Sequence, residues 1–430
     1  MKLRLRSFPV VAIVAMLFVT PTKANADAVA DWNLIAIQRI NTAVPARPGP
    51  ITFVDMALVQ VAVYDAVQAI ERRYKPYHVS IPGASGSPDA AAATAAHDMI
   101  VYLFPEDPNQ VGSIGQIYQH YLEDRGLIGD PGVNVGHAVA GAIIALRAND
   151  GRFPPGQVPF VGGDNPGQWR PTESFIGMPP SPPSNAPMVA PWLGNVTPFT
   201  LKSGDQFRAA PPPPLTSSEY TKAYNEVKAM GARFNSERTQ QETDLALFWA
   251  ANYVVVWNAV VRNLAAAHVD NIADSSRLFA LVNLAMGDAI ITAWDSKNAY
   301  VFWRPLTAIR LGESDTNPDT EGNPIWQPLI NTPNYPDHSS GANNVSAAAT
   351  RSLALFFDTN EMSFIVRTTN AAATQPTRTY NRFTDAAQDV VDARIYEGIH
   401  FRFADEEARK QGRHVAQWVF GHFLKPLDDE

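Results

Sequence analysis

Three basic side chains and one histidine in the C-terminal half of the chain could together bind an oxyanion. Lys297 and Arg304 lie in the stretch WDSKNAYVFWRP, and the segment RIYEGIH begins at Arg394 and ends at His400. A cation about 4 Å from an anion contributes about 4 kcal/mol at an effective dielectric constant of about 20. An imidazole can act as a nucleophile or as a metal ligand. These residue types indicate a site for a tetrahedral oxyanion.

The spacing within each segment predicts how the side chains meet. Seven residues are about two helical turns, so Lys297 and Arg304 would point the same way on a continuous helix, which the following proline is expected to end or kink. Arg394 and His400 are about 240° apart on a helix, so they share a cavity only if the chain breaks at Gly398. Each segment alone also fits a plainer interpretation, a solvated basic face or a buried structural histidine.

A third segment, YPDHSSGA, places a helix start between the other two. Ser340 and Gly341 precede an alanine-rich helix, so the free backbone N–H groups of its first turn are expected to point outward. A glycine at this position lets an anion approach the backbone closely. The alternative is an ordinary serine N-cap.

Taken in order, Lys-x6-Arg-Pro, Ser-Gly at a helix start and Arg-x5-His resemble the motifs of a known superfamily. That superfamily joins the vanadium-dependent haloperoxidases and the class A acid (phosphatidate-type) phosphatases. The run VYDAV at 63–67, Asp288 and WDSK at 294–297 are similar to its secreted bacterial haloperoxidase-related branch. The resemblance covers most of the chain after residue 26, and the ordered triple motif is its specific part.

The resemblance implies a role for each matching residue. His400 would be the apical vanadium ligand of a peroxidase, or the phosphatase nucleophile that forms a phosphohistidine. Ser340 and the Gly341 amide would complete the cradle. The residues implied to bind the equatorial oxygens of vanadate or phosphate are Lys297, Arg304 and Arg394.

The chain departs from the family pattern at two positions. The histidine that usually follows Ser-Gly as general acid–base is Ala342 here, and losing such a group typically lowers the rate by about 10²–10⁴. His338, four residues earlier, is the candidate catalytic residue that could replace it. The acidic residue often found four positions after His400 is Ala404, followed by Asp405. These departures predict weakened or altered catalysis with oxyanion binding retained.

Three functional hypotheses follow. The first is a vanadium-dependent haloperoxidase-like enzyme that binds vanadate, with phosphate as a competing oxyanion, and oxidises a halide with hydrogen peroxide. The second is a soluble acid phosphatase acting on a phosphate ester. The third is a non-catalytic oxyanion-binding homologue, motivated by Ala342. Whether the chain forms a homodimer is left open.

Composition and the N-terminal segment narrow the cellular context. The net charge of −8 argues against nucleic acid or an anionic membrane surface as partner, and the absence of cysteine excludes disulfides and thiolate chemistry. Residues 1–26 have the basic start, short apolar run and Ala24-Asn25-Ala26 site of a signal peptide, with a retained anchor as the alternative. We therefore expect a mature chain from Asp27 that is exported to the periplasm or secreted.

Apolar periodicity predicts an all-α fold of two helical bundles side by side. The expected units are an N-terminal helical half at 27–151, a Pro/Gly-rich connecting segment at 152–215 and a C-terminal helical half at 216–430 that carries the site. The main expected helices cover 28–43, 51–74, 90–103, 114–122, 133–148, 216–231, 239–267, 275–294, 341–356 and 403–424.

Overall fold

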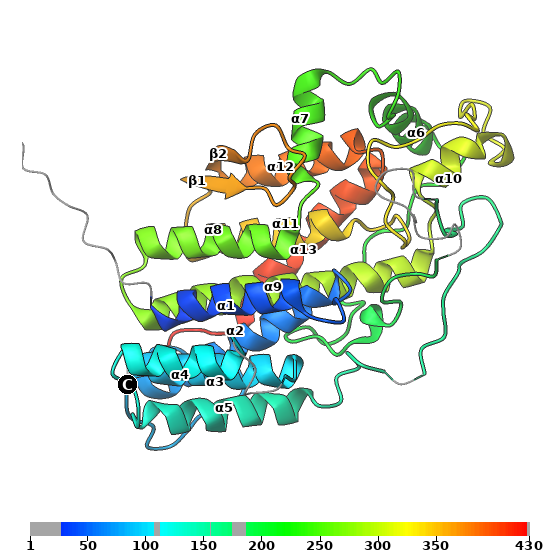
Figure 1. Ribbon diagram of the computed structural model, residues 1–430. Coiled ribbons are helices and arrows are strands. Elements are labelled where there is room, and N and C mark those ends of the chain that lie inside the picture. The colour runs from blue at the N-terminus through cyan, green and yellow to red at the C-terminus, as the bar shows by residue number, and fades with distance from the viewer. Residues whose placement is uncertain (1–26, 107–111, 155, 174–185, 428–430) are drawn as a thin grey trace, which may run out of the picture.

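The computed structural model describes residues 27–106, 112–154, 156–173 and 186–427, and these ranges are mostly helical (Figure 1). The expected signal peptide lies outside them. The helices of the first half are α1 (Ala28–Thr42), α2 (Ile51–Glu71), α3 (Pro88–Leu103), α4 (Ile114–Asp124) and α5 (Gly132–Arg147). The later elements are η1 (Leu193–Asn195), α6 (Ser218–Met230), α7 (Gln240–Trp249), α8 (Tyr253–His268), α9 (Ile272–Tyr300), α10 (Pro305–Arg310), η2 (Gly312–Ser314), α11 (Gly341–Phe356), β1 (Glu361–Arg367), β2 (Thr377–Arg382), α12 (Phe383–Tyr396) and α13 (Arg402–His422).

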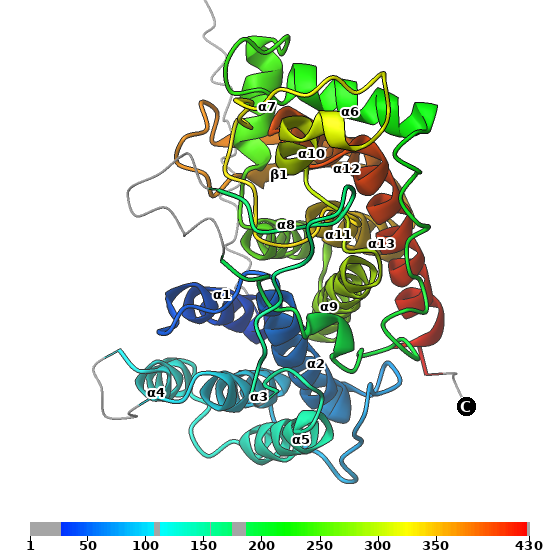
Figure 2. The same cartoon turned by 90° about the vertical axis from the view of Figure 1, so that its right-hand side faces the viewer.

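Two long apolar helices, α2 and α9, pack against each other at the centre. Helices α3 and α5 lie beyond α2, whereas α11 and α13 pack on α9, so both views show layered helices (Figures 1 and 2). By length and composition alone α2 and α9 could each cross a membrane, and 94% of the apolar stretch of each is buried inside the protein. Their hydrophobicity therefore serves the core, because a helix apolar on all sides must be buried.

The all-α prediction is confirmed. In the described part of the chain, the only sheet is the antiparallel hairpin of β1 and β2, in which Phe364 faces Tyr380. One hydrophobic core runs from α1 to the end of α13, and a smaller one surrounds Trp303 and Phe401. The large core crosses the expected boundary between the two halves, and the division at 152–215 stays a prediction.

The prediction of a single helix over 239–267 was wrong in one respect. Its start is confirmed, since Thr239 and Glu242 form a reciprocal capping box. However, the chain breaks after Trp249, and α7 and α8 meet at a bend of 87°. The Asn252 backbone N–H donates to the Thr369 hydroxyl instead of to a helical carbonyl, so a distant loop directs the break.

Several other boundaries differ from prediction. Helix α9 starts three residues before the expected serine because Asn271 caps it by accepting from the Asp274 backbone N–H, and it continues to Tyr300. Helix α6 is capped by Ser217, one residue after the expected threonine. Helix α12 was not predicted, since only its end had been interpreted, as part of the site motif.

The connecting segment packs on the protein where it is described. Trp169 is fully buried, stacks with Phe160 and donates its backbone N–H to the Val301 carbonyl over 2.7 Å. The Trp303 N–H donates to the Gly167 carbonyl over 2.9 Å. These bonds hold the segment against the chain between α9 and α10, where the site begins.

Two buried carboxylates on the central helices hold loops in place. Asp65 of α2 accepts from the backbone N–H groups of three consecutive residues, 77–79, at 2.6 to 3.0 Å. Asp288 of α9 accepts from Phe199 N–H and from the backbone and hydroxyl of Thr200. Asp65 and Asp288 are among the residues that resemble the secreted bacterial haloperoxidase-related branch. In this fold their carboxylates hold loops against the central helices.

Candidate active site

The structure brings the three predicted cations together from three different elements. Lys297 lies in the last turn of α9, Arg304 directly precedes α10, and Arg394 lies in the last turn of α12. Their exposed fractions are 0%, 0% and 6%. The expectation that Pro305 ends the first helix was wrong: α9 already ends at Tyr300, and the proline starts α10. Proline suits a first helical position because its fixed φ is helical and no N–H is needed there.

Burial lowers the pKa of two of the three cations, Lys297 and Arg304. The pKa of Lys297 is lowered well below its usual value, first by burial and then by Arg304. Its ammonium donates to the carbonyls of Pro336 at 2.6 Å and Asp337 at 3.0 Å. The Tyr335 ring lies 4.9 Å from the ammonium and 4.8 Å from the Arg304 guanidinium, so both cations also contact an aromatic face.

His400 is positioned by the predicted break in the chain. Gly398 has φ +79°, and a Cβ there would lie 2.4 Å from the Gly231 carbonyl oxygen, so only glycine fits. The His400 Nε2 lies 3.0 Å from Arg304 Nη1, and its Nδ1 lies 2.8 Å from Asp337 Oδ1.

The state of His400 follows from these partners. Burial, and then Arg304, lower its pKa well below the usual value, so the ring is neutral near pH 7. A guanidinium only donates, so Nε2 accepts from Arg304 and the single ring proton is assigned to Nδ1, facing Asp337. The Nε2 lone pair thus lies among the cations and is engaged by Arg304, which would have to release it before Nε2 could act as a metal ligand or nucleophile.

Three buried carboxyl groups accompany the cations, and they were not predicted as site residues. Glu397 forms an ion pair with Arg394 at 2.5 Å, and Asp337 lies 3.6 Å from Arg304. Asp405 contacts the Ser340 hydroxyl and accepts from Asn343 at 2.7 Å. Asp337 and Glu397 stand inside the two motifs that contain the site, YPDHSSGA and RIYEGIH, which was the available signal.

Burial controls the protonation of these carboxyl groups. It raises the pKa of Asp337 to about 7 although Arg304 and Lys297 oppose the shift, and it raises the pKa of Glu397 to about 7 against Arg394. The pKa of Asp405 is raised well above its usual value, mainly by burial. For Arg394, burial lowers the pKa but the Glu397 carboxylate outweighs it and raises it. The site thus becomes more positive as the pH falls.

Ser340 and Gly341 stand at the start of α11, as predicted. Within this described helix, no side-chain hydrogen bond caps the first turn, so the serine is not an ordinary N-cap. The Ser340 N–H donates to the Ala404 carbonyl over 3.2 Å, which ties the start of α11 to α13. A Cβ at Gly341 would lie 3.1 Å from the Trp294 ring, so the glycine allows a close approach between the two helices.

A cleft of about 330 Å³ reaches the site at Arg394 and Gly341, whereas Lys297, Arg304 and His400 lie behind its lining residues. Arg394, Gly341 and Ala342 line it, and Trp294 and Tyr335 belong to its largely apolar wall. Position 342, where the family usually has a histidine, therefore faces the cleft. An imidazole at this position would reach the same space.

His338 stands apart from the cleft. Its Nε2 donates to the Ala210 carbonyl over 2.6 Å, and its ring packs edge-on against Tyr300. Burial lowers its pKa to about 4, so the ring is neutral near pH 7. Like His400, Lys297 and Arg304, it is not among the residues that line the cleft, and its role in place of the missing histidine stays a prediction.

The donor set fits a tetrahedral oxyanion such as vanadate or phosphate. Within the described residues, Arg304 Nη2 and Arg394 Nε are buried without a hydrogen-bond partner. A buried donor without a partner is costly, and an anion between the two guanidinium groups would satisfy both. Lys297 adds a third cation, and His400 adds the neutral lone pair that vanadium coordination requires.

Comparisons with known proteins show which sequences resemble this chain. The family model described as the VCPO second helical-bundle domain matches residues 277–429, which include all three motifs. The vanadium chloroperoxidase of Curvularia inaequalis is 26% identical over 399 residues, covering 75% of this chain. The match spans 64% of that protein, less than two thirds of its length.

Solved structures extend the likeness to the whole fold. A bacterial vanadium-dependent iodoperoxidase is 25% identical, with a TM-score of 0.75 over 94% of this chain and 97% of its own. The apo form of a bacterial vanadium-dependent chloroperoxidase is 16% identical, with a TM-score of 0.69 over 88% of this chain and 94% of its own. The second likeness shows the fold alone.

Proposed function

We propose that the chain is a member of the superfamily of the vanadium-dependent haloperoxidases, and that it binds vanadate and oxidises a halide with hydrogen peroxide. The observation that carries the proposal is the meeting of Lys297, Arg304 and Arg394 with a neutral His400 in one buried site. When bound, vanadate would supply the activation of hydrogen peroxide. The chain's own residues would hold the anion, keep water out and set its charge environment.

Each part of the site has a distinct task in this proposal. The two guanidinium groups and the Lys297 ammonium would neutralise the oxygens of the anion, and the His400 Nε2 would be the ligand to the metal. Asp337, whose Oδ1 lies 2.8 Å from Nδ1, would favour the tautomer with the proton on Nδ1 and the lone pair on Nε2, as carboxylates commonly do for ligating histidines. The first-turn amides of α11 would add about 0.3–1 kcal/mol, so they orient the anion more than they hold it.

The cleft indicates where the reactants meet. Its apolar wall, with Trp294, Tyr335 and Phe53, offers a surface for an organic acceptor beside Arg394. Peroxide and halide would enter through the same opening. We further propose that the protein works outside the cytoplasm, on the strength of the signal sequence at residues 1–26.

The test is halide oxidation by the mature protein, with iodide, bromide and chloride, with and without added orthovanadate. The expected result is vanadate-dependent oxidation that phosphate suppresses. His400→Ala should abolish both activity and vanadate binding, whereas His120→Ala, an exposed histidine on α4, should change neither. Halide oxidation that is independent of vanadate, or unaffected by His400→Ala, would contradict the assignment.

A second candidate, oxyanion binding without efficient catalysis, is favoured by one observation. Ala342 lines the cleft, and His338 is bonded elsewhere, so no histidine side chain of the described residues lines the cleft. Ala342→His should then raise halide oxidation, by as much as the ~10²–10⁴ of a general acid–base group. No gain would count against the idea that only this group is missing. The phosphatase alternative gains no support from these relatives, and phosphate-ester hydrolysis without peroxide remains its test.

A further inference from the structure

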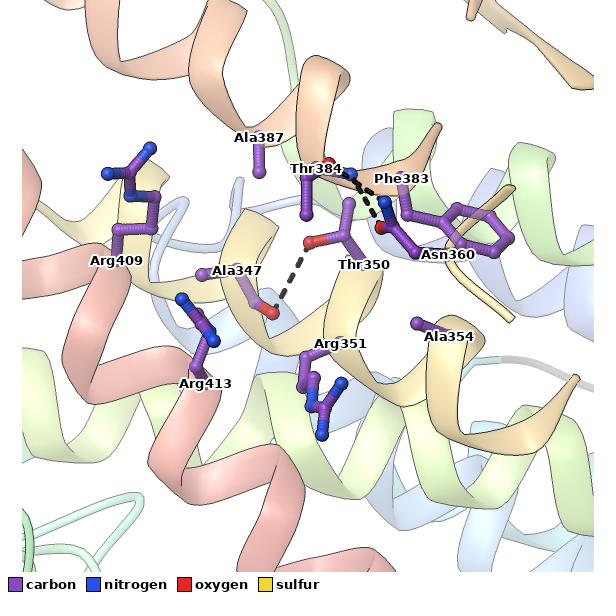
Figure 3. A pocket seen from close by; sticks show the side chains of 10 residues that line it. All are labelled: Ala347, Thr350, Arg351, Ala354, Asn360, Phe383, Thr384, Ala387, Arg409 and Arg413. Atoms are coloured by element: carbon purple, nitrogen blue, oxygen red, sulfur yellow. Dashed lines mark hydrogen bonds between the residues drawn. The ribbon is translucent and has the colours of Figure 1, made fainter. Parts of the chain in front are cut away.

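A second cleft lies on the C-terminal bundle, apart from the residues of the proposed active site. It encloses about 190 Å³ and is bounded by three helices, α11, α12 and α13 (Figure 3). Three of its lining residues are arginines: Arg351 from α11, and Arg409 and Arg413 from α13. None of its lining residues belongs to the cleft at Gly341.

The three arginines have no carboxylate partner. Within the described part of the chain, none of them forms an ion pair, and the Arg351 Nε is buried without a hydrogen-bond partner. Arg409 donates to the neutral Gln388 side chain. Arg402, on the same helix α13, contrasts with them: it pairs with Glu226 at 2.7 Å and with Asp392 at 2.8 Å.

The arrangement is unfavourable for the empty protein. Arg409 and Arg413 are four residues apart on α13, and like charges at this spacing destabilise a helix. Arg351 adds a third positive charge to the same cleft. In a chain of net charge −8, carboxylates are plentiful, yet none was placed here. A cluster of this kind is typical of a site whose counter-ion is a ligand.

We propose that this cleft binds a small organic oxyanion with an apolar body, such as a carboxylate or phosphate ester carrying a ring. Guanidinium groups pair with planar carboxylate or phosphate oxygens through two parallel hydrogen bonds. The rest of the lining suits the body of the ligand, because Ala347, Ala354, Ala387 and Phe383 present apolar surface. The enclosed volume favours a small molecule over a polymer.

Titration calorimetry on the full mature protein tests the proposal with three probes of graded chemistry. Benzoate has the charge and the ring, benzamide has the ring alone, and inorganic phosphate has the charge alone. We expect benzoate to bind at one site and at least tenfold more tightly than benzamide, or than phosphate binds to this cleft; phosphate binding that persists when both Arg351 and Arg413 are replaced by Gln is assigned to the proposed active site. Raising the ionic strength should weaken benzoate binding because the arginines are partly exposed. Equal binding of benzamide, or no binding of benzoate, would overturn the proposal.

Substitutions of the arginines test whether benzoate binds in this cleft. Arg351→Gln and Arg413→Gln should each weaken benzoate binding about tenfold, and the double variant should abolish it, whereas Lys202→Gln, an exposed cation outside the cleft, should not change it. Vanadate binding should be equal in all four proteins, which separates this site from the proposed active site. The melting temperature should stay equal or rise, since no ion pair is lost. Benzoate binding that survives in the double variant, or a lowered melting temperature that marks the arginines as structural, would contradict the proposal.

Discussion

The protein gathers three basic side chains twice, and the two groups are built in opposite ways. In the proposed active site, Lys297, Arg304 and Arg394 are buried, and three buried carboxyl groups accompany them. In the cleft of Arg351, Arg409 and Arg413, the side chains are partly exposed and no carboxylate pairs with any of them among the described residues. The difference follows from desolvation: a buried charge without a counter-charge costs several kcal/mol, whereas a hydrated one does not.

The anion affinities of the two groups of basic side chains should depend on different solution conditions. The counter-charges of the active site titrate, since the pKa values of Asp337 and Glu397 are raised to about 7. Its affinity for anions should therefore depend on pH. Arg351, Arg409 and Arg413 are partly exposed, so the affinity of their cleft for anions should depend on the salt concentration.

The largest effect should come from removing one buried cation. Arg304→Ala would remove the ion-pair partner of Asp337 and the donor to His400, so we expect vanadate binding to be lost. The free energy of unfolding should fall by about 3–5 kcal/mol, as for a broken buried ion pair. Urea unfolding and vanadate titration measure the two changes. Arg310→Ala, which removes a partly exposed arginine paired with Glu173, is the control and should cost less than about 1 kcal/mol.

Gly398→Ala should have the next largest effect. The left-handed backbone and the 2.4 Å approach to the Gly231 carbonyl leave no room for a methyl group, so the turn that positions His400 must shift. We expect a loss of stability of at least ~1–3 kcal/mol, measured by urea unfolding, together with weaker vanadate binding. Gly141→Ala, in helix α5 with open space around it, should instead stabilise by about 0.5–1 kcal/mol. Equal effects at the two glycines would contradict the proposed role of the turn.

Asp337→Asn tests whether Asp337 causes the expected pH dependence of anion binding at the proposed active site. The carboxyl group of Asp337 binds a proton in the folded protein up to about pH 7, but only up to about pH 4 when exposed, so its ionisation lowers folding stability as the pH rises through that range. Ionisation also adds a negative charge beside the anion. Vanadate affinity of the parent should thus fall by up to about tenfold per pH unit above pH 7, beyond any change in the ionisation of vanadate itself. The variant should show a flatter profile, and the difference between the two titrations isolates this residue. Parallel profiles would exclude Asp337 as the controlling group.

The smallest effect is expected at the outer cleft. Arg413→Gln removes a like-charge contact with Arg409, and the unliganded protein should gain about 0.2–0.5 kcal/mol of unfolding free energy. Arg402→Gln on the same helix removes two ion pairs and should destabilise instead. Urea unfolding at low salt measures both. Loss of stability in the two variants alike would remove the contrast between paired and unpaired arginines.

Much of the site could be predicted from local sequence, because its cations and its helix start are marked by residues close in the chain. Ser340-Gly341 placed the start of α11 correctly, and Gly398 marked the break before His400. The buried carboxyl groups were missed although two stand inside the same motifs. Their importance depends on burial, which a sequence does not display. The position of His338 depends on a bond to Ala210 in the connecting segment, a contact between residues 128 apart.

The fold likewise has features that local sequence predicts and features that depend on contacts between distant residues. Apolar periodicity located most helices to within a few residues, since one buried face repeats every turn. The bend between α7 and α8 was missed because it depends on Thr369, more than a hundred residues away. Helix α12 was missed because only its end had been interpreted, and the hairpin before it because β1 and β2 are short strands with mainly exposed side chains.

Asp65 and Asp288, the two aspartates that hold loops, limit where the protein can unfold locally. Asp65 and Asp288 bind the backbone of residues 77–79 and 199–200 to α2 and α9, two long helices whose apolar stretches are each 94% buried. Those amides lie in irregular chain, where hydrogen exchange is ordinarily fast. Tied to the central pair, they can exchange only when that pair separates, so their protection should approach that of the core. These two loops thus belong kinetically to the last part of the protein to unfold.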